Sequence, residues 1–346
     1  MRVLVTSAGG ALAPLNIRLM KESRRHEVFL VAVDQRAEAA GRFFADAFAM
    51  VPGGGDPGYV EAIVALIRRH GIGLVLPWSD EEALALAAAR PRIEREGATL
   101  ACAPLETLKV MADKAASYRA LVAAGLAMPE WVVAETPDAL AAAVACFADR
   151  GDFAVKPGRA RGNRGVVVVR RDARGATLYL GSRERHADLA TFREELMAEV
   201  AGNLPALVME RLDAPAYDID ILAWEGRLLR AMPRRRLNPA GVPFTGGVLV
   251  PRDDLMTLAR QVTAALNVSW LYDYDLMTDR NGRPVVIEIN PRPSGSIAAS
   301  ILAGIPFYDD LISLAKGERI PDVEVPATVA VVPYLDCKLV PVEALP

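Results

Sequence analysis

The chain has 346 residues, enough for two or three domains, and 52% of them are hydrophobic, which excludes a largely disordered protein. A formal net charge of −3 gives no overall signal for nucleic-acid binding. The three cysteines have no CxxC spacing, which argues against a zinc site and a disulfide framework. Without a signal-peptide pattern or an apolar run of roughly 18 residues, we expect a cytoplasmic protein.

Residues 1–104 alternate short apolar strands with helices, which predicts a parallel sheet covered by helices in an α/β fold. The expected strands lie at 3–6, 28–33, 72–77 and 99–102, and the expected helices lie between them at 14–23, 59–70 and 81–96. The turn Ser7-Ala8-Gly9-Gly10, with Asp34 ending the second strand, resembles a dinucleotide-binding turn but lacks the G-x-G-x-x-G pattern. NAD binding is therefore an alternative, and a tight turn that shapes a substrate pocket is favoured over it.

Residues 105–185 are expected to form a smaller unit, with helices at 105–111 and 114–124. Its strand Phe153–Pro157 carries Lys156 and runs into a loop with Gly158, Gly162 and Gly165. Glycines let backbone N–H groups approach a polyphosphate closely, and the lysine adds a point charge. Taken alone, this pattern is also that of an ordinary Arg/Gly hairpin. The loop has few apolar anchors, so we expect little burial to order it in the absence of a ligand.

Residues 186–320 are expected to form a larger mixed unit, followed by a strand and coil over 321–346. Its most informative segment is Val285-Val-Ile-Glu-Ile-Asn-Pro-Arg292, in which Glu288 and Asn290 share one face of a strand, about 7 Å apart. The upstream Asn281-Gly282 pair indicates a hairpin turn. A two-residue loop would give the pairs 279/284, 277/286, 275/288 and 273/290.

Those pairs place Asp275 opposite Glu288 and Asp273 opposite Asn290. Like charges directly opposite each other repel, and a hard divalent cation with oxygen ligands, Mg²⁺ or Mn²⁺, would remove that repulsion. The alternative is a solvated sheet face with spare acids. An odd-length loop would instead place Tyr274 opposite Glu288.

Taken together, the motifs occur in a characteristic order. A lysine follows Asp113, Val155-Lys156-Pro157 precedes a glycine loop, Val208-Met209-Glu210 comes next, and an arginine cluster precedes Glu288-Ile-Asn-Pro-Arg292. This order resembles the ATP-grasp superfamily over residues 1–320, in particular its carbamoyl-phosphate-synthase-like branch. The resemblance implies a Rossmann-like pre-grasp domain (1–104), a small lid domain (105–185), a central domain with the metal site (186–320) and a C-terminal extension (321–346).

The resemblance also assigns residues to roles. It implies that Lys114 and Lys156 bind the α- and β-phosphates of ATP, and that the loop with Gly162, Arg164 and Gly165 closes over them. The adenine hinge would be Met209, Glu210 and Leu212; the magnesium ligands Asp275, Glu288 and Asn290; the catalytic arginines Arg292 and one of Arg234, Arg235 and Arg236, for which we take Arg235. Ala216 stands where the family has a ribose-binding glutamate, so we expect Asp218 to replace it.

The reaction implied is phosphorylation of a carboxylate by ATP and its ligation to an amine or thiol, with release of ADP and phosphate. The partners expected are ATP, Mg²⁺ or Mn²⁺ and small-molecule substrates, with no nucleic acid or membrane, and a homodimer as one expected assembly. Two alternatives remain open at this point. One is an NAD(P)-dependent oxidoreductase built on the first domain, and the other is a module that binds ATP without turnover.

Overall fold

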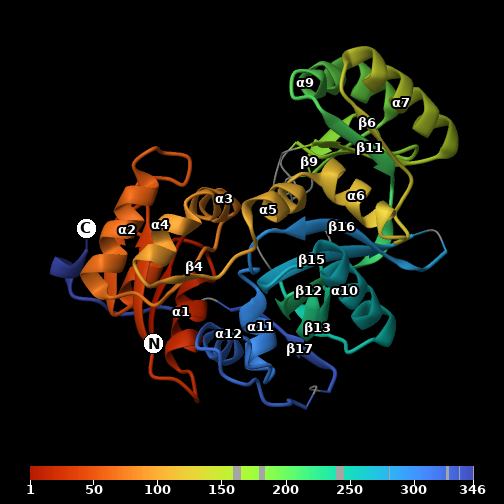
Figure 1. Ribbon diagram of the computed structural model, residues 1–346. Coiled ribbons are helices and arrows are strands. Elements are labelled where there is room, and N and C mark those ends of the chain that lie inside the picture. Colours follow the sequence, from red (N-terminus) through yellow and green to blue (C-terminus); the bar gives the residue numbers. More distant parts are fainter. Residues whose placement is uncertain are drawn as a thin grey trace.

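Three β-sheets organise the chain, and they are separate in space (Figure 1). The structure is a computed structural model that describes residues 1–158, 165–178, 184–238, 245–279, 281–324, 327–334 and 336–345. The first sheet belongs to the red and orange part of the chain, the second to the yellow-green part, and the third to the teal and blue part. Among the described residues, no helix is both long and apolar enough to span a bilayer.

The first sheet is parallel, in the order β3-β2-β1-β4-β5, and helices cover it, as the α/β rhythm predicted. The helix expected over 81–96 is two helices that meet at Ala89, because Pro91 lacks an N–H group and suits only a first helical turn. The elements are β1 (Arg2–Val5), α1 (Ala13–Lys21), β2 (Phe29–Asp34), a 3₁₀ turn (Ala40–Phe43), β3 (Ala47–Met50), α2 (Tyr59–His70), β4 (Leu74–Leu76), α3 (Asp80–Ala88), α4 (Arg90–Arg95) and β5 (Thr99–Leu100).

The second sheet has the order β6-β11-β7-β8-β10-β9, and α7 packs on one of its faces. The boundary that we expected after residue 185 falls within β10, and the sheet continues to Glu210 because β11 pairs with both β6 and β7. Its elements are β6 (Trp131–Ala134), α7 (Pro137–Arg150), β7 (Phe153–Pro157), β8 (Val167–Val169), β9 (Ala176–Leu178), β10 (Arg185–Ala187), α8 (Leu189–Thr191), a π-helical turn (Phe192–Leu196), α9 (Met197–Ala201) and β11 (Ala206–Glu210).

The third sheet is antiparallel, in the order β16-β15-β12-β13-β14-β17. Helix α10 packs on its apolar face, where Leu258 and Val262 join the same core as Ile219 and Tyr274. The elements are β12 (Asp213–Trp224), β13 (Arg227–Arg236), β14 (Gly247–Leu249), α10 (Asp253–Leu266), β15 (Trp270–Thr278), β16 (Pro284–Asn290), α11 (Ile297–Leu302), α12 (Phe307–Ala315), β17 (Val329–Val331) and a 3₁₀ turn (Val342–Ala344).

Two helices connect the first sheet to the others, α5 (Leu105–Ala112) and α6 (Lys114–Ala123). The Asp113 side chain caps α6 by accepting a hydrogen bond from the Ala116 backbone N–H, 2.9 Å away. This cap fixes where α6 begins. Lys114 is therefore the first residue of α6, at the end that is nearest to β16.

Polar contacts join the first sheet's helices to the third unit. The Asn16 amide of α1 donates to the Gly295 carbonyl at 2.7 Å and accepts from the Tyr308 hydroxyl at 2.7 Å. Arg25 pairs with Asp310, whose side chain is fully buried, and Arg230 also reaches Asp310 at 2.8 Å. A buried carboxylate held by two arginines ties these two parts of the chain together.

The β15–β16 hairpin has the predicted pairs at its functional end but not at its turn. Asp275 lies opposite Glu288 and Asp273 opposite Asn290, as predicted. Near the turn the pairs are 277/285 and 278/284, because the loop has an odd number of residues. A β-bulge at Ile287 absorbs the resulting shift of one residue, so that the far pairs keep the even-loop register.

Candidate active site

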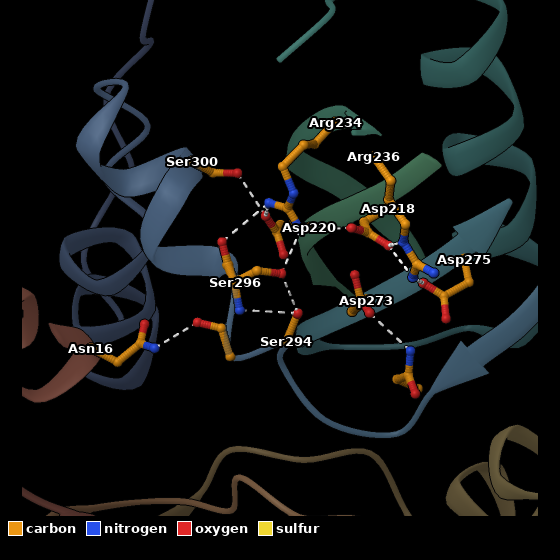
Figure 2. Close-up of polar contacts among 12 residues, drawn as sticks. Asn16, Asp218, Asp220, Arg234, Arg236, Asp273, Asp275, Ser294, Ser296 and Ser300 are labelled. Atoms are coloured by element: carbon orange, nitrogen blue, oxygen red, sulfur yellow. Dashed lines mark hydrogen bonds and ion pairs between the residues drawn. The ribbon is translucent and has the colours of Figure 1, made fainter. Parts of the chain in front are cut away.

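One face of the third sheet gathers charged side chains from four adjacent strands. In β12 and β15, aspartates alternate with core residues such as Ile219 and Tyr274, so the acids share the face opposite α10. Strand β13 pairs with β12 so that Arg234 lies opposite Asp218. We call this surface the charged face; it carries Asp218, Asp220, Arg234, Arg236, Asp273, Asp275, Glu288 and Asn290. Figure 2 shows the first six of these side chains.

The predicted metal ligands lie together on the charged face, on neighbouring strands. Glu288 pairs with Lys114 at 2.9 Å, Asp275 accepts from Arg236 at 2.5 Å, and Asn290 donates to Asp273 at 2.8 Å. Burial raises the pKa of Asp275 to about 7, although Arg236 opposes this shift. Burial acts on Glu288 in the same direction, but Lys114 holds its pKa below the usual range. Two partly buried carboxylates and an amide oxygen fit the donor set of Mg²⁺, so the metal assignment stays a prediction that the geometry allows.

The arginines of the charged face are Arg234 and Arg236, and not Arg235, which we expected. Side chains alternate along a strand, so Arg235 points to the opposite face and is exposed. Arg236 contacts both Asp218 and Asp275, and Arg234 is fully buried between Asp218 and Asp220, at 3.0 Å from each. Asp218 and Asp220 alternate along the neighbouring strand, and this alternation indicates that Arg234 and Arg236, and not Arg235, share their face.

Asp218, the predicted ribose ligand, is one of the residues of the charged face. It is 4% exposed and is held by Arg234 and Arg236 in the interior of the charged face. Burial would raise the pKa of Asp218, but these two arginines hold it well below the usual range. Both oxygens of Asp218 are engaged by arginines, which disfavours a contact with sugar hydroxyls, and the ribose role stays a prediction.

The two predicted lysines face the charged face from separate elements. Lys114 is nine-tenths buried beside Glu288, at the start of α6. Lys156 lies in β7 on the same side as Ala154, whereas Val155 points to the α7 core. Burial and then the proximity of Lys114 lower the pKa of Lys156. Two cations that are brought this close together form a site for a group with several negative charges.

An apolar cluster joins the second and third sheets beside these lysines. It contains the predicted hinge residues Met209 and Leu212 together with Ala154 of β7 and Val285 of β16, with Ile287 packed against it. Such a cluster is the kind of wall that a flat aromatic base requires. The Glu210 side chain instead accepts from the Glu130 N–H at 2.9 Å, so its carboxylate is tied to the β6 end of the sheet.

The β16 bulge explains how apolar and acidic residues reach the same side. In a regular strand Ile287 and Glu288 would face opposite sides, and we expected Val285, Ile287 and Ile289 to share one face. Val285 and Ile287 do lie on the side of the second sheet, but Ile289 packs in the α10 core. The phase changes at the bulge, which places the apolar wall and Glu288 on consecutive residues of one side.

The glycine-rich loop is only partly within the described residues. Gly162 and Arg164 lie outside them, so their predicted contacts with phosphate, and the lid role, stay predictions. Gly165 has a φ of +71°, a conformation that L side chains rarely adopt. At Gly158 an added Cβ would approach the Pro205 carbonyl oxygen to 2.9 Å, so both described ends of the loop require glycine.

Arg292 is held by an acid from the first unit that the sequence did not reveal. Its Nε lies 3.2 Å from Asp80 Oδ1, and Asp80 begins α3, where it is 8% exposed. Ser79 caps this helix, and three residues later Glu82 accepts from the Ser79 hydroxyl at 2.6 Å. The S-x-x-E pattern of this cap was readable, but no sequence pattern links it to Arg292 across more than 200 residues.

The turn that resembled a dinucleotide site is filled by its own neighbours. The Gly9 N–H donates to Asp34 Oδ2 at 2.7 Å, and a Cβ at Gly9 would meet the Arg36 side chain at 2.6 Å. Asp34 is the acid that a dinucleotide site would use for a ribose. Its engagement with the turn itself does not favour the NAD alternative.

Two family models match the chain. Residues 203–337 match "ATP-grasp in the biosynthetic pathway with Ter operon", and residues 3–101 match the "PylC-like, N-terminal domain". These matches cover the third sheet and the first sheet respectively. No curated protein sequence matches the chain.

Solved structures share the arrangement at low sequence identity. The biotin carboxylase domain of 2-oxoglutarate carboxylase from Hydrogenobacter thermophilus, in complex with MgADP, ADP and bicarbonate, is 18% identical with a TM-score of 0.69, covering 92% of this chain and 70% of that one. N5-carboxyaminoimidazole synthetase from Staphylococcus aureus with ADP gives 13% and 0.67, covering 92% and 78%. An L-amino acid ligase from Bacillus licheniformis gives 15% and 0.62, covering 91% and 73%. The motif order, the family models and the three-sheet architecture agree that the chain has the ATP-grasp fold, with an ATP-grasp match over residues 203–337 and a PylC-like match over residues 3–101.

Proposed function

We propose that the protein is an ATP-dependent ligase that activates a carboxylate as an acyl phosphate and joins it to an amine or thiol. The observation that carries this proposal is the pairing of Lys114 with Glu288 at 2.9 Å, with Lys156 close by. Cations for phosphate and acids for a metal thus meet beside an apolar wall. The solved structures with ADP or MgADP support the same reading of the site.

In the proposed complex, Lys114 and Lys156 bind phosphate oxygens, and the wall of Met209, Leu212 and Ile287 receives the base. Asp275, Glu288 and Asn290 would hold Mg²⁺ or Mn²⁺. The bound ion would supply positive charge that lowers the repulsion between the phosphate chain and a carboxylate. The ion pair with Glu288 holds Lys114 in position before a metal binds. When Glu288 binds the metal instead, Lys114 would still be within reach of the phosphates.

The reaction brings two anions together, and the arginines reduce the electrostatic repulsion between them. A carboxylate oxygen of the substrate forms a bond to the γ-phosphorus while the bond to the β–γ bridging oxygen breaks and ADP leaves. Arg292 is held by Asp80 at 3.2 Å and presents a fixed positive charge beside Asn290. The amine or thiol then attacks the acyl carbon, loses its proton, and phosphate leaves. No covalent enzyme intermediate is needed in this scheme.

Hydroxylamine trapping tests the acyl phosphate without knowledge of the natural nucleophile. The protein is incubated with Mg²⁺-ATP, hydroxylamine and pools of carboxylic acids, and hydroxamate and ADP are measured. We expect both products to form in equal amounts for the pool that contains the substrate. ATP binding without ADP formation across all pools would instead favour a non-catalytic nucleotide-binding module.

Metal removal should weaken nucleotide binding. ADP should raise the melting temperature much more in Mg²⁺ than in EDTA, because a ligand that binds only the folded state stabilises it by RT ln(1 + [L]/Kd) and the metal increases the affinity. Thermal-shift measurements with ADP, with NADH and without ligand check this prediction. Equal shifts by ADP in both buffers would contradict the metal assignment, and a shift by NADH alone would favour the oxidoreductase.

Lys156→Ala should weaken ADP binding by roughly 1–3 kcal/mol, the range for a charge-assisted hydrogen bond. Lys109→Ala is the matched control, because Lys109 lies on α5 with its side chain 56% exposed. Isothermal titration of both variants measures the difference. If Lys156→Ala bound ADP as tightly as the control does, Lys156 would be an ordinary strand-end lysine.

The division into four domains, the cytoplasmic location, the homodimer and the identity of the substrates remain predictions.

A further inference from the structure

Three aspartates of the charged face converge in its interior. Asp218, Asp273 and Asp275 each offer a carboxylate oxygen, and these oxygens all lie within 4.8 Å of one another. Only Asp275 belongs to the predicted nucleotide-linked metal set. The other two lie deeper, each 4% exposed. A shared centre of this size suits one small cation.

One oxygen of this cluster has no partner. Asp273 Oδ2 accepts from the Asn290 amide, whereas Asp273 Oδ1 is buried and makes no hydrogen bond. Figure 2 shows the Asp273 carboxylate extending from β15 toward Asp218 and Asp220. A buried carboxylate oxygen without a donor is costly, so the site is incomplete as it stands.

The charges around the cluster of three aspartates are also unbalanced. Asp218, Asp220, Asp273 and Asp275 carry four negative charges when ionised, and Arg234 and Arg236 supply two positive charges. Arg234 is committed to Asp218, Asp220 and Ser296. Arg236 bridges Asp218 and Asp275, and the arginines of the charged face leave Asp273 Oδ1 without a hydrogen bond. One divalent cation would neutralise the remaining difference.

We propose that Asp218, Asp273 and Asp275 form a divalent-cation site of their own, which fills without nucleotide. Its ligands are all carboxylate oxygens, the set that Mg²⁺, Mn²⁺ and Ca²⁺ favour. Arg236 now spans two of the three ligands and its side chain is 24% exposed, so it is the group that a cation displaces. The site is separate from the ligase proposal because occupancy requires neither ATP nor turnover.

Paramagnetic resonance of Mn²⁺ in titrations of the full-length, nucleotide-free protein tests the site. We expect one bound Mn²⁺ per chain in the wild type. Asp273→Asn and Asp218→Asn should each weaken this binding at least tenfold, whereas Asp172→Asn, which changes an exposed acid, should leave it unchanged. Glu288→Gln should retain it, because Glu288 is not among the three ligands.

Folding is controlled by melting curves in EDTA, in which Asp273→Asn should melt no lower than the wild type because the buried oxygen Oδ1 that it replaces makes no hydrogen bond. Adding Mn²⁺ should then raise the melting temperature of the wild type and not that of Asp273→Asn. Absence of nucleotide-free Mn²⁺ binding by the wild type would overturn the proposal, whatever the variants do. So would binding lost in Glu288→Gln but kept in Asp273→Asn, since the ion would then belong to the nucleotide-linked site. Neither outcome bears on hydroxamate formation, which tests the ligase activity separately.

Discussion

Glu288→Gln should slow ATP turnover by roughly 10²–10³-fold, the range for removing one group that stabilises charge in a transition state. Glutamine keeps the shape of the side chain and can still accept a hydrogen bond from Lys114, but it removes the negative charge that would hold the metal. The rate of ADP formation at saturating ATP and Mg²⁺ measures the effect. Melting curves should show a fold that is retained, with a loss of about 1–3 kcal/mol for the weakened contact with Lys114.

Glu195→Gln is the matched control, because it makes the same substitution at an exposed glutamate of the second unit. It should turn over ATP at the wild-type rate. A Glu288→Gln variant that kept the wild-type rate would remove Glu288 from the metal site, and the Lys114 pair would then be an ordinary buried ion pair.

Arg234→Met should lower the free energy of unfolding by about 3–5 kcal/mol, the cost of breaking a buried ion pair by removing one partner. Arg234 is fully buried and contacts Asp218, Asp220 and Ser296. Methionine fills part of the space but leaves Asp220 without its cation, whereas Asp218 keeps its contact with Arg236. Urea denaturation followed by circular dichroism measures the change. The Asp220 side chain is fully buried, so water cannot solvate the carboxylate that has lost its arginine.

The neighbouring residue provides the control. Arg235→Met makes the same substitution one position along β13, where the side chain is exposed, and it should change the stability by no more than about 0.5 kcal/mol. Similar losses in the two variants would mean that the strand, and not the buried pairing with the aspartates, is what the substitutions disturb.

The placement of the site residues could be predicted from the sequence where it follows strand periodicity. The pairing of Asp275 with Glu288 and the convergence of the two lysines came from residue order and from the family resemblance, and β7 has the predicted bounds. Arg236 could also have been found, because residues 234 and 236 alternate in step with Asp218 and Asp220. The choice of Arg235 failed because the arginine run was treated as a cluster and not as a strand.

Other features depend on contacts that no local pattern encodes. Asp80 reaches Arg292 from another sheet, and β11 joins the second sheet although it lies 49 residues after β7 ends in the chain at Pro157. The bulge at Ile287 was invisible for a different reason. A shift in the turn and a shift in the strand cancel at Asp275, so a wrong loop length still gave the right functional pairs.

The cancellation makes the position of Glu288 depend on one feature of the backbone, the bulge at Ile287. The bulged residue is held from outside the sheet, because the Tyr118 hydroxyl of α6 donates to the Ile287 carbonyl at 3.1 Å. Without the bulge, the register of the turn would continue along β16 and place Glu288 opposite Tyr274. Glu288 would then share the face of Tyr274, which packs in the α10 core, and would leave the charged face. A hydroxyl on α6 therefore contacts the one residue on which the position of Glu288 depends.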